Sequence, residues 1–136
     1  MMTDDAGLRR ILQPGCVIAV VGLSANPDRP SYRVARYLIE HGYTVIPVNP
    51  VCREALGQKC YAALRDIPQR VDIVDCFRRA EDIPPLADDA IAIGARVLWM
   101  QLGVVNPEAA RKAEAAGLEV VMDRCVKIEH ARLFGG

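Results

Sequence analysis

Short apolar runs alternate with amphipathic stretches along the whole chain. Residues 16–22 are apolar and rich in β-branched side chains, as expected of a strand buried on both faces. Residues 31–41 place apolar side chains on one face and charged ones on the other, the pattern of a surface helix. By the same reasoning we predict strands over residues 44–48, 59–61, 71–77, 96–101 and 118–122, a helical turn ending near residue 68, and helices over 5–13, 84–94, 106–117 and 127–133.

This alternation predicts an α/β fold. Because the strands are apolar throughout, we expect a mainly parallel sheet of five to six strands with helices on both faces, in three layers α/β/α. The chain has 136 residues, a length that favours one domain spanning residues 1–136. The clearest helix start is Asn106, an N-cap followed by Pro107 at the first helical position.

Composition narrows the class of protein. Lys and Arg number 17, as do Asp and Glu, and this balance argues against a nucleic-acid binder. The longest apolar run, residues 16–23, is far shorter than the roughly 20 residues of a membrane span. We therefore expect a soluble cytoplasmic protein with no membrane contact. The five cysteines lack a C-x-x-C pair, which favours reduced thiols over a disulfide framework or zinc site.

Ligands of parallel α/β sheets bind outside the carboxyl ends of the strands. That rule selects residues 22–33, 49–53, 75–79, 101–106 and 123–127. These segments hold seven Lys or Arg and three Asp, a local surplus of four positive charges that suits a phosphorylated ligand.

The loop after the first strand carries the strongest signal. Gly22 lets a ligand approach the backbone, and the following helix N-terminus attracts phosphate. Ser24 and Ser31 add hydroxyl donors, and Arg29 adds a charge for bidentate contact. The loop lacks the G-K-[ST] of a P-loop and the G-x-G-x-x-G of dinucleotide-binding folds. The alternative interpretation is a proline-rich turn that only leads into a helix.

The second strand ends in Asn49 and Pro50, where an NAD site usually has an acidic residue. This disfavours NAD, although Asn49 would still be able to bind a ribose hydroxyl. An NAD(P)-binding, redox-sensing domain therefore remains an alternative.

The segments GLSANPDRPSYRVARYLIEHGYTVIPVNP, LGQKCYAALRDIP, VDIVDCFRRAEDIPP, WMQLGV and DRCVKIEHARL resemble the small stand-alone CoA-binding domain proteins. These are related to the CoA-binding domains of the succinyl-CoA synthetase α subunit and of NDP-forming acyl-CoA synthetases. The resemblance covers roughly residues 8–133. It implies a Rossmann-like fold with CoA, or an acyl-CoA, at the carboxyl ends of the strands.

The resemblance also implies roles for individual residues. Gly22, Ser24, Arg29 and Ser31 would serve the phosphates, Asn49 and Pro50 would lie near adenosine, Phe77 and Arg78 would form the far wall, and Gln101 would line the pantetheine path. Asn26, Pro27 and Tyr32 of the first loop complete the predicted cofactor-binding set.

Candidate catalytic residues are few. His41 reads as a helix-end residue and His130 as a surface or capping residue. Cys125 has Arg124 and Lys127 nearby, which would lower its pKa and allow exchange with the CoA thiol, or it is only a small buried residue.

Three cysteines, Cys16, Cys60 and Cys76, read as core, whereas Cys52 follows a turn and reads as exposed. Trp99 reads as a packing residue.

We therefore expect CoA binding without catalysis. The alternatives are a subunit or half of a split acyl-CoA synthetase, and a thiol- or acyl-exchange enzyme using Cys125. A homodimer and an unidentified protein partner both remain open.

Overall fold

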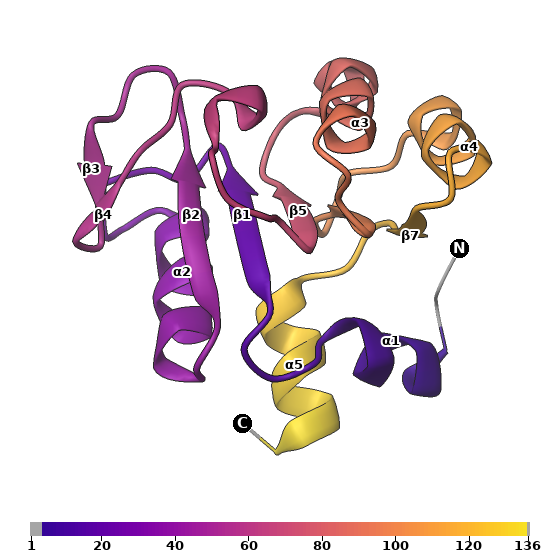
Figure 1. Cartoon of the computed structure of the whole chain (residues 1–136). Helices are drawn as coiled ribbons and strands as arrows, with labels where there is room; N and C mark the ends of the chain where they lie inside the picture. The colour runs from indigo at the N-terminus through magenta and orange to yellow at the C-terminus, as the bar shows by residue number, and fades with distance from the viewer. Residues whose placement is uncertain (1–3, 136) are drawn as a thin grey trace.

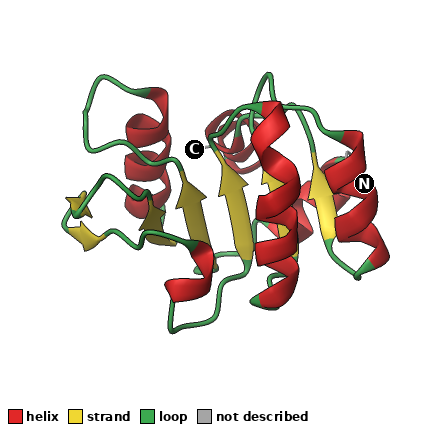
Figure 2. Ribbon diagram, turned by 90° about the horizontal axis from the view of Figure 1, so that it is seen from above, coloured by secondary structure: helices red, strands yellow, loops and turns green. Residues whose placement is uncertain are grey.

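A single parallel sheet forms the centre of the protein. The computed structural model describes residues 4–135. Five strands lie in the order β2-β1-β5-β6-β7, and every neighbouring pair is parallel, as the strand arrows of Figure 2 show. Their bounds are β1 Val17–Val21, β2 Thr44–Val48, β5 Ile73–Cys76, β6 Val97–Met100 and β7 Glu119–Val121. The predicted α/β class and the five-stranded parallel sheet are confirmed.

Helices cover both faces of the sheet (Figure 1). One face is covered by α1 (Asp5–Ile11), α2 (Pro30–Glu40) and α5 (Val126–Phe134), and the other by α3 (Ile83–Ala92) and α4 (Pro107–Ala115). Each layer has its own apolar core: Leu8 and Leu38 belong to the first, and Leu98 and Ala113 to the second. Since the central strands are covered on both sides, β1 and β6 are apolar throughout their sequences.

The strand order reverses between β1 and β5. The chain pairs β2 with one edge of β1 and later returns to place β5 along the other edge. Ile18 is the register partner of both Val45 and Ile73. At such a reversal the loops leaving the two strands diverge to opposite faces, which opens a crevice at their carboxyl ends.

The strand predicted at residues 59–61 is wrong in most of its length. Instead, β3 (Glu54–Ala55) and β4 (Gln58–Lys59) form an antiparallel hairpin outside the main sheet. Leu56 and Gly57, both with positive φ, make its two-residue turn. Directly after the hairpin, Tyr61 forms a parallel bridge to Val48 of β2. The two strands are too short to show an alternating pattern in the sequence.

The helices follow their sequence signals closely. Asn106 is the N-cap of α4, and its side-chain oxygen accepts a hydrogen bond of 2.9 Å from the Ala109 amide, as predicted. The buried face of α4 consists of Ala109, Ala110 and Ala113, whereas Ala116 at its C-cap is exposed. A 3-10 turn, η1 (Leu64–Asp66), forms the predicted turn before residue 68, and a second, η2 (Ala80–Asp82), precedes α3.

None of the helices within residues 4–135 combines the length and the hydropathy that a membrane crossing requires.

Candidate functional site

The loop after β1 begins at a glycine that no other residue can replace without strain. Gly22 has φ +89°, and a Cβ atom built on it would lie 2.2 Å from the carbonyl oxygen of Phe77. The Gly22 amide donates a 2.8 Å hydrogen bond to Val48. Gly22 thus allows the ends of β1, β2 and β5 to converge at the crevice, a close approach that a side chain would block.

Hydrogen bonds within the loop fix its path toward α2. The Ser24 amide donates to the Ser31 hydroxyl oxygen at 3.0 Å, and the Asn26 amide donates to the Ser24 hydroxyl oxygen at 3.1 Å. Arg29 is the N-cap of α2. A guanidinium has no acceptor with which to cap the helix amides, so the positive end of α2 is left to water or an anion.

A cavity of about 420 Å³ lies at this helix end. Its wall includes both serines of the loop and two arginines. The side-chain amide of Asn49 donates to the Leu23 carbonyl at 3.1 Å, which links the end of β2 to the loop. The lining residues are Gly22, Ser24, Arg29, Pro30, Ser31, Asn49, Phe77 and Arg78. The cavity therefore combines hydrogen-bond donors with positive charge, the chemistry of a phosphate site.

A larger cavity of about 860 Å³ adjoins the first. The two share Pro30, Phe77 and Arg78 as lining residues, so they lie side by side at the carboxyl ends of the strands. Most of the larger cavity is apolar, with a few polar groups. Its remaining lining residues are Val34, Arg79, Asp82, Gln101, Leu102, Val104, Cys125 and Ile128.

A buried carboxyl group holds Gln101 at the edge of the larger cavity. Asp75 lies within β5 and is fully buried, and the Gln101 side-chain amide donates to one of its oxygens. The other oxygen has no hydrogen-bond partner within the described residues. Burial raises the pKa of Asp75 to about 7, while the hydrogen bond from Gln101 opposes that rise. Because the Gln101 nitrogen is used by Asp75, the oxygen of the same amide is left as the acceptor that Gln101 can offer a ligand.

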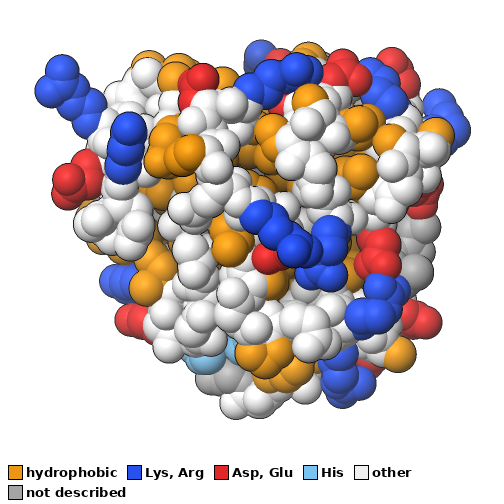
Figure 3. Space-filling model, viewed as in Figure 1, with side chains coloured by type: hydrophobic (Ala, Val, Ile, Leu, Met, Phe, Trp, Pro, Cys, Tyr) orange, Lys and Arg blue, Asp and Glu red, His pale blue; other side chains and the backbone are white. Residues whose placement is uncertain are grey.

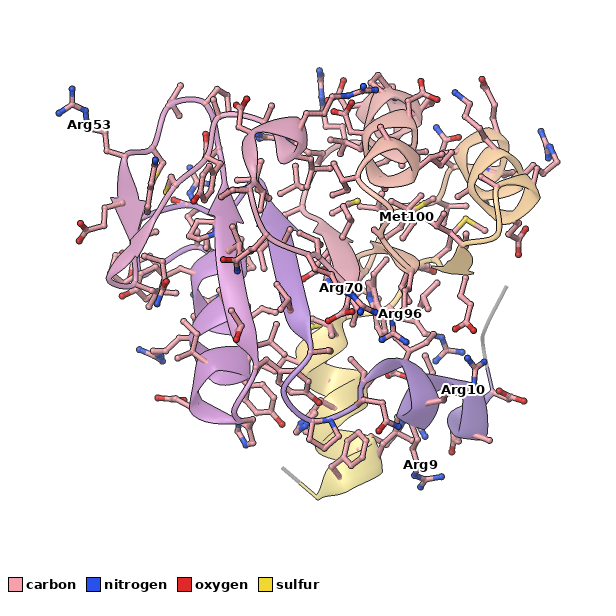
Figure 4. All side chains as sticks on the ribbon, in the orientation of Figure 1. Arg9, Arg10, Arg53, Arg70, Arg96 and Met100 are labelled. Atoms are coloured by element: carbon pink, nitrogen blue, oxygen red, sulfur yellow. The ribbon has the colours of Figure 1, made fainter. Side chains whose placement is uncertain are left out.

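The positive charge is more local than the sequence count suggests. Within residues 4–135, Arg29 and Arg78 form no ion pair, and both line the smaller cavity. By contrast, Arg79 pairs with Asp82 at 3.2 Å, and Arg53 points away from the rest of the protein in Figure 4. Of the arginines in the expected surplus, Arg29 and Arg78 are those that line the smaller cavity.

At the opposite end of the sheet, two arginines are paired with a carboxylate. Arg70 and Arg96, labelled in Figure 4, flank Asp72 at 3.2 and 3.4 Å. Figure 3 shows Lys and Arg side chains gathered around an Asp or Glu side chain near the middle of this view. Asp72 also accepts a 2.9 Å hydrogen bond from the Val17 amide. These arginines are paired with a carboxylate, whereas in the described part of the chain Arg29 and Arg78 are not, which favours the carboxyl end as the site for an anionic ligand.

The structure brings together eight of the twelve predicted site residues around the two cavities: Gly22, Ser24, Arg29, Ser31, Asn49, Phe77, Arg78 and Gln101. Four do not line either cavity. Pro27 and Pro50 are exposed. Tyr32 is a partly buried residue of α2 that packs against the apolar core, and the Asn26 side chain accepts a hydrogen bond from the Asp28 amide. Asn26, Pro27 and Pro50 belong to the loops and Tyr32 belongs to α2, so none of the four forms part of a cavity wall.

Sequence reasoning missed the apolar wall and the carboxyl group behind it. Leu102 and Ile128 are exposed side chains of the larger cavity, and nothing in the sequence separates them from ordinary surface residues. Asp75 was visible in the sequence, since it interrupts an otherwise apolar strand. A buried acid in that position is a sign of a functional or structural contact.

The two histidines lie together, away from the cavities. His41 is the C-cap of α2, and its Nδ1 atom lies 2.8 Å from the Tyr37 carbonyl oxygen, as a helix-end residue should. The surface role expected for His130 is wrong, because its ring is buried and hydrogen-bonded to the Tyr37 hydroxyl at 2.7 Å. Burial, together with the nearby His41, lowers the pKa of His130.

The other predictions for single residues fare better. Trp99 is a fully buried packing residue, and Cys16, Cys60 and Cys76 are buried as predicted. Cys52 is half-buried.

Comparison with known proteins gives one family. The sequence profile of the CoA binding domain matches residues 16–131. The uncharacterized protein YneT of Bacillus subtilis is 44% identical over 94% of this chain and 95% of its own length. A hypothetical protein from Pyrococcus horikoshii has the same fold, with a TM-score of 0.94 and 44% identity over 98% of this chain and 94% of that one.

A longer enzyme is also similar. The ADP-forming acetate–CoA ligase I of Archaeoglobus fulgidus is 26% identical over 88% of this chain, which spans only 19% of that ligase. The profile match covers most of the chain, and the similar small protein is matched along nearly its whole length. The chain therefore belongs to the CoA-binding domain family.

Proposed function

We propose that this protein binds CoA in the two adjoining cavities, with its phosphates at the N-terminus of α2 and its pantetheine arm along the apolar cavity. The observation that carries the proposal is that a small cavity lined by two arginines adjoins a larger apolar one, with Pro30, Phe77 and Arg78 lining both. CoA has the same division, since a highly charged nucleotide is joined to a long, weakly polar arm that ends in a thiol.

The chemistry of the lining supports each half. Arg29 and Arg78 would hold phosphate oxygens by charge-assisted hydrogen bonds, helped by the positive end of α2. Gln101 would accept a hydrogen bond from an amide of the pantetheine arm, because Asp75 fixes its orientation. An apolar cavity of about 860 Å³ is within the usual size of ligand sites. An acyl-CoA fits the same chemistry.

An NAD(P) ligand fits less well. Asn49 lines the cavity at the end of β2, where NAD sites usually place an acid for the ribose hydroxyls. The smaller cavity offers two arginines instead, which suits the additional 3′-phosphate of CoA. A catalytic role for Cys125, which lines the larger cavity, remains a prediction.

Calorimetric titration with CoA, acetyl-CoA, dephospho-CoA and NAD tests the proposal. We expect CoA to bind more tightly than NAD. Arg29→Ala should weaken CoA binding about tenfold or more, because a hydrogen bond to a charged group contributes about 1.5–3 kcal/mol. Arg36→Ala is the matched control, since Arg36 is an exposed arginine of the same helix outside both cavities. Tighter binding of NAD, or no CoA binding at millimolar concentration, would refute the proposal.

A further inference from the structure

The β3–β4 hairpin brings two cysteine side chains into contact. Cys52 lies just before β3 and Cys60 directly after β4. Their Sγ atoms are 2.7 Å apart, with the Cys60 thiol donating toward Cys52. The sequence did not predict this contact, because Cys52 and Cys60 lack the C-x-x-C spacing of a cysteine pair.

The backbone holds the two thiols in this position. The Cys60 amide donates to the Arg53 carbonyl at 2.9 Å, which continues the ladder of Glu54 with Lys59. The Cys52 amide donates to the Asn49 carbonyl at 3.3 Å. Both ends of the hairpin are thus anchored, and the sulfur atoms face each other without any rearrangement of the chain.

The two thiols differ in access. Cys60 is buried, with 8% of its surface exposed, whereas Cys52 is only half-buried. Burial, followed by the neighbouring Cys52 thiol, raises the pKa of Cys60 to about 12. Because Cys52 is the more exposed of the two, a reagent in solution reaches it first. The raised pKa keeps Cys60 protonated at first, and its Sγ atom lies close enough to attack what forms on Cys52 once the proton is lost.

We propose that Cys52 and Cys60 are a redox-active pair that forms a reversible disulfide by exchange with a low-molecular-weight disulfide. The Cys52 thiolate attacks one sulfur atom of that disulfide and releases the first small thiol. The Cys60 thiolate then attacks the Cys52 sulfur of the mixed disulfide and releases the second small thiol. The two cysteines are oxidised, the small disulfide is reduced by the same two electrons, and the two cysteine protons pass to the released thiols.

The pair lies beside the proposed CoA site without being part of it. Asn49 lines the smaller cavity, and its backbone amide donates to the Tyr61 carbonyl at 2.9 Å. The segment between Asn49 and Tyr61 therefore begins and ends beside the carboxyl end of β2. A bond between Cys52 and Cys60 would close this segment into a ring. The chemistry of the pair does not depend on CoA binding, and it stands if that proposal fails.

Thiol counting on the full chain tests the pair. The reduced, denatured protein has five free thiols. After incubation of the native protein with glutathione disulfide, we expect the loss of two thiols, with peptide mapping linking Cys52 to Cys60 and a reductant restoring both. Cys52→Ser and Cys60→Ala should abolish this link, whereas Cys125→Ser should keep it.

Three results would overturn the proposal. In the first, all five thiols persist in excess glutathione disulfide. In the second, a mixed disulfide on Cys52 persists without conversion to the internal bond. In the third, the internal bond joins another pair of cysteines. Because the decisive mapping uses the unmodified protein, a variant that fails to fold does not affect the test.

Discussion

Asp75 should make the stability of this protein fall as the pH rises. The carboxyl group is fully buried, and burial raises its pKa from 3.8 to about 7. Between these two values the native state binds a proton that the unfolded chain releases, so the free energy of unfolding decreases with increasing pH. Each pKa unit corresponds to about 1.4 kcal/mol, and the full cost of ionising Asp75 in the fold is therefore about 4 kcal/mol.

Part of this free-energy change occurs in a pH range in which unfolding can be measured. Between about pH 5 and about pH 8, the contribution of Asp75 to the free energy of unfolding should fall by about 2.5 kcal/mol. Asp75→Asn removes the titrating group and keeps the shape of the side chain. Urea denaturation of both proteins at the two pH values, followed by the fluorescence of Trp99, measures the difference. The variant should gain about 2.5 kcal/mol relative to the unmodified protein on going to the higher pH.

Groups that titrate in both proteins cancel in this comparison. Asp66→Asn, which removes an exposed carboxylate, is the control and should keep the slope of the unmodified protein. If the Asp75→Asn protein and the unmodified protein lose stability in parallel over this range, the buried carboxyl group does not titrate as argued.

Three further predictions concern stability, each measured by denaturant unfolding. Gly22→Ala should cost at least about 2 kcal/mol more than Gly42→Ala, because both sites have positive φ but only the first would press a Cβ against the Phe77 carbonyl; equal losses would contradict this. Asn106→Ala should cost about 1 kcal/mol through the lost N-cap, and a neutral effect would argue against that role. His130 has a lowered pKa, so its contribution weakens the fold as the pH falls below 6.5, opposite in sign to the contribution of Asp75; His130→Gln should remove this part of the acid destabilisation.

Those parts of the fold that rest on regular patterns were predictable. Buried parallel strands such as Val97–Met100 appear in the sequence as unbroken apolar runs, and Asn106 indicates the start of α4. The site followed from the position of strand ends rather than from a complete motif. Gly22 and Phe77 are 55 positions apart, yet both lie at carboxyl ends of neighbouring strands.

The features that escaped prediction depend on contacts between side chains. The hairpin around Leu56 has strands of two residues, which carry no periodic signal. The approach of Cys52 to Cys60 follows from that hairpin and so was hidden with it. Ile128 lines the larger cavity only because α5 is seated against the sheet, and its sequence position gives no sign of this.

The burial of Trp99 has a consequence for following the folding reaction. This is the sole tryptophan of the chain, and its indole N–H donates to the Arg124 carbonyl at 2.8 Å, at the point where the chain enters α5. It belongs to the apolar core that also contains Leu8 and Val126, two residues from distant parts of the sequence. Such long-range contacts form slowly, because the intervening chain must first be ordered. The blue shift of Trp99 emission on refolding would therefore report the rate at which this apolar core forms. Circular dichroism would report the formation of the helices separately.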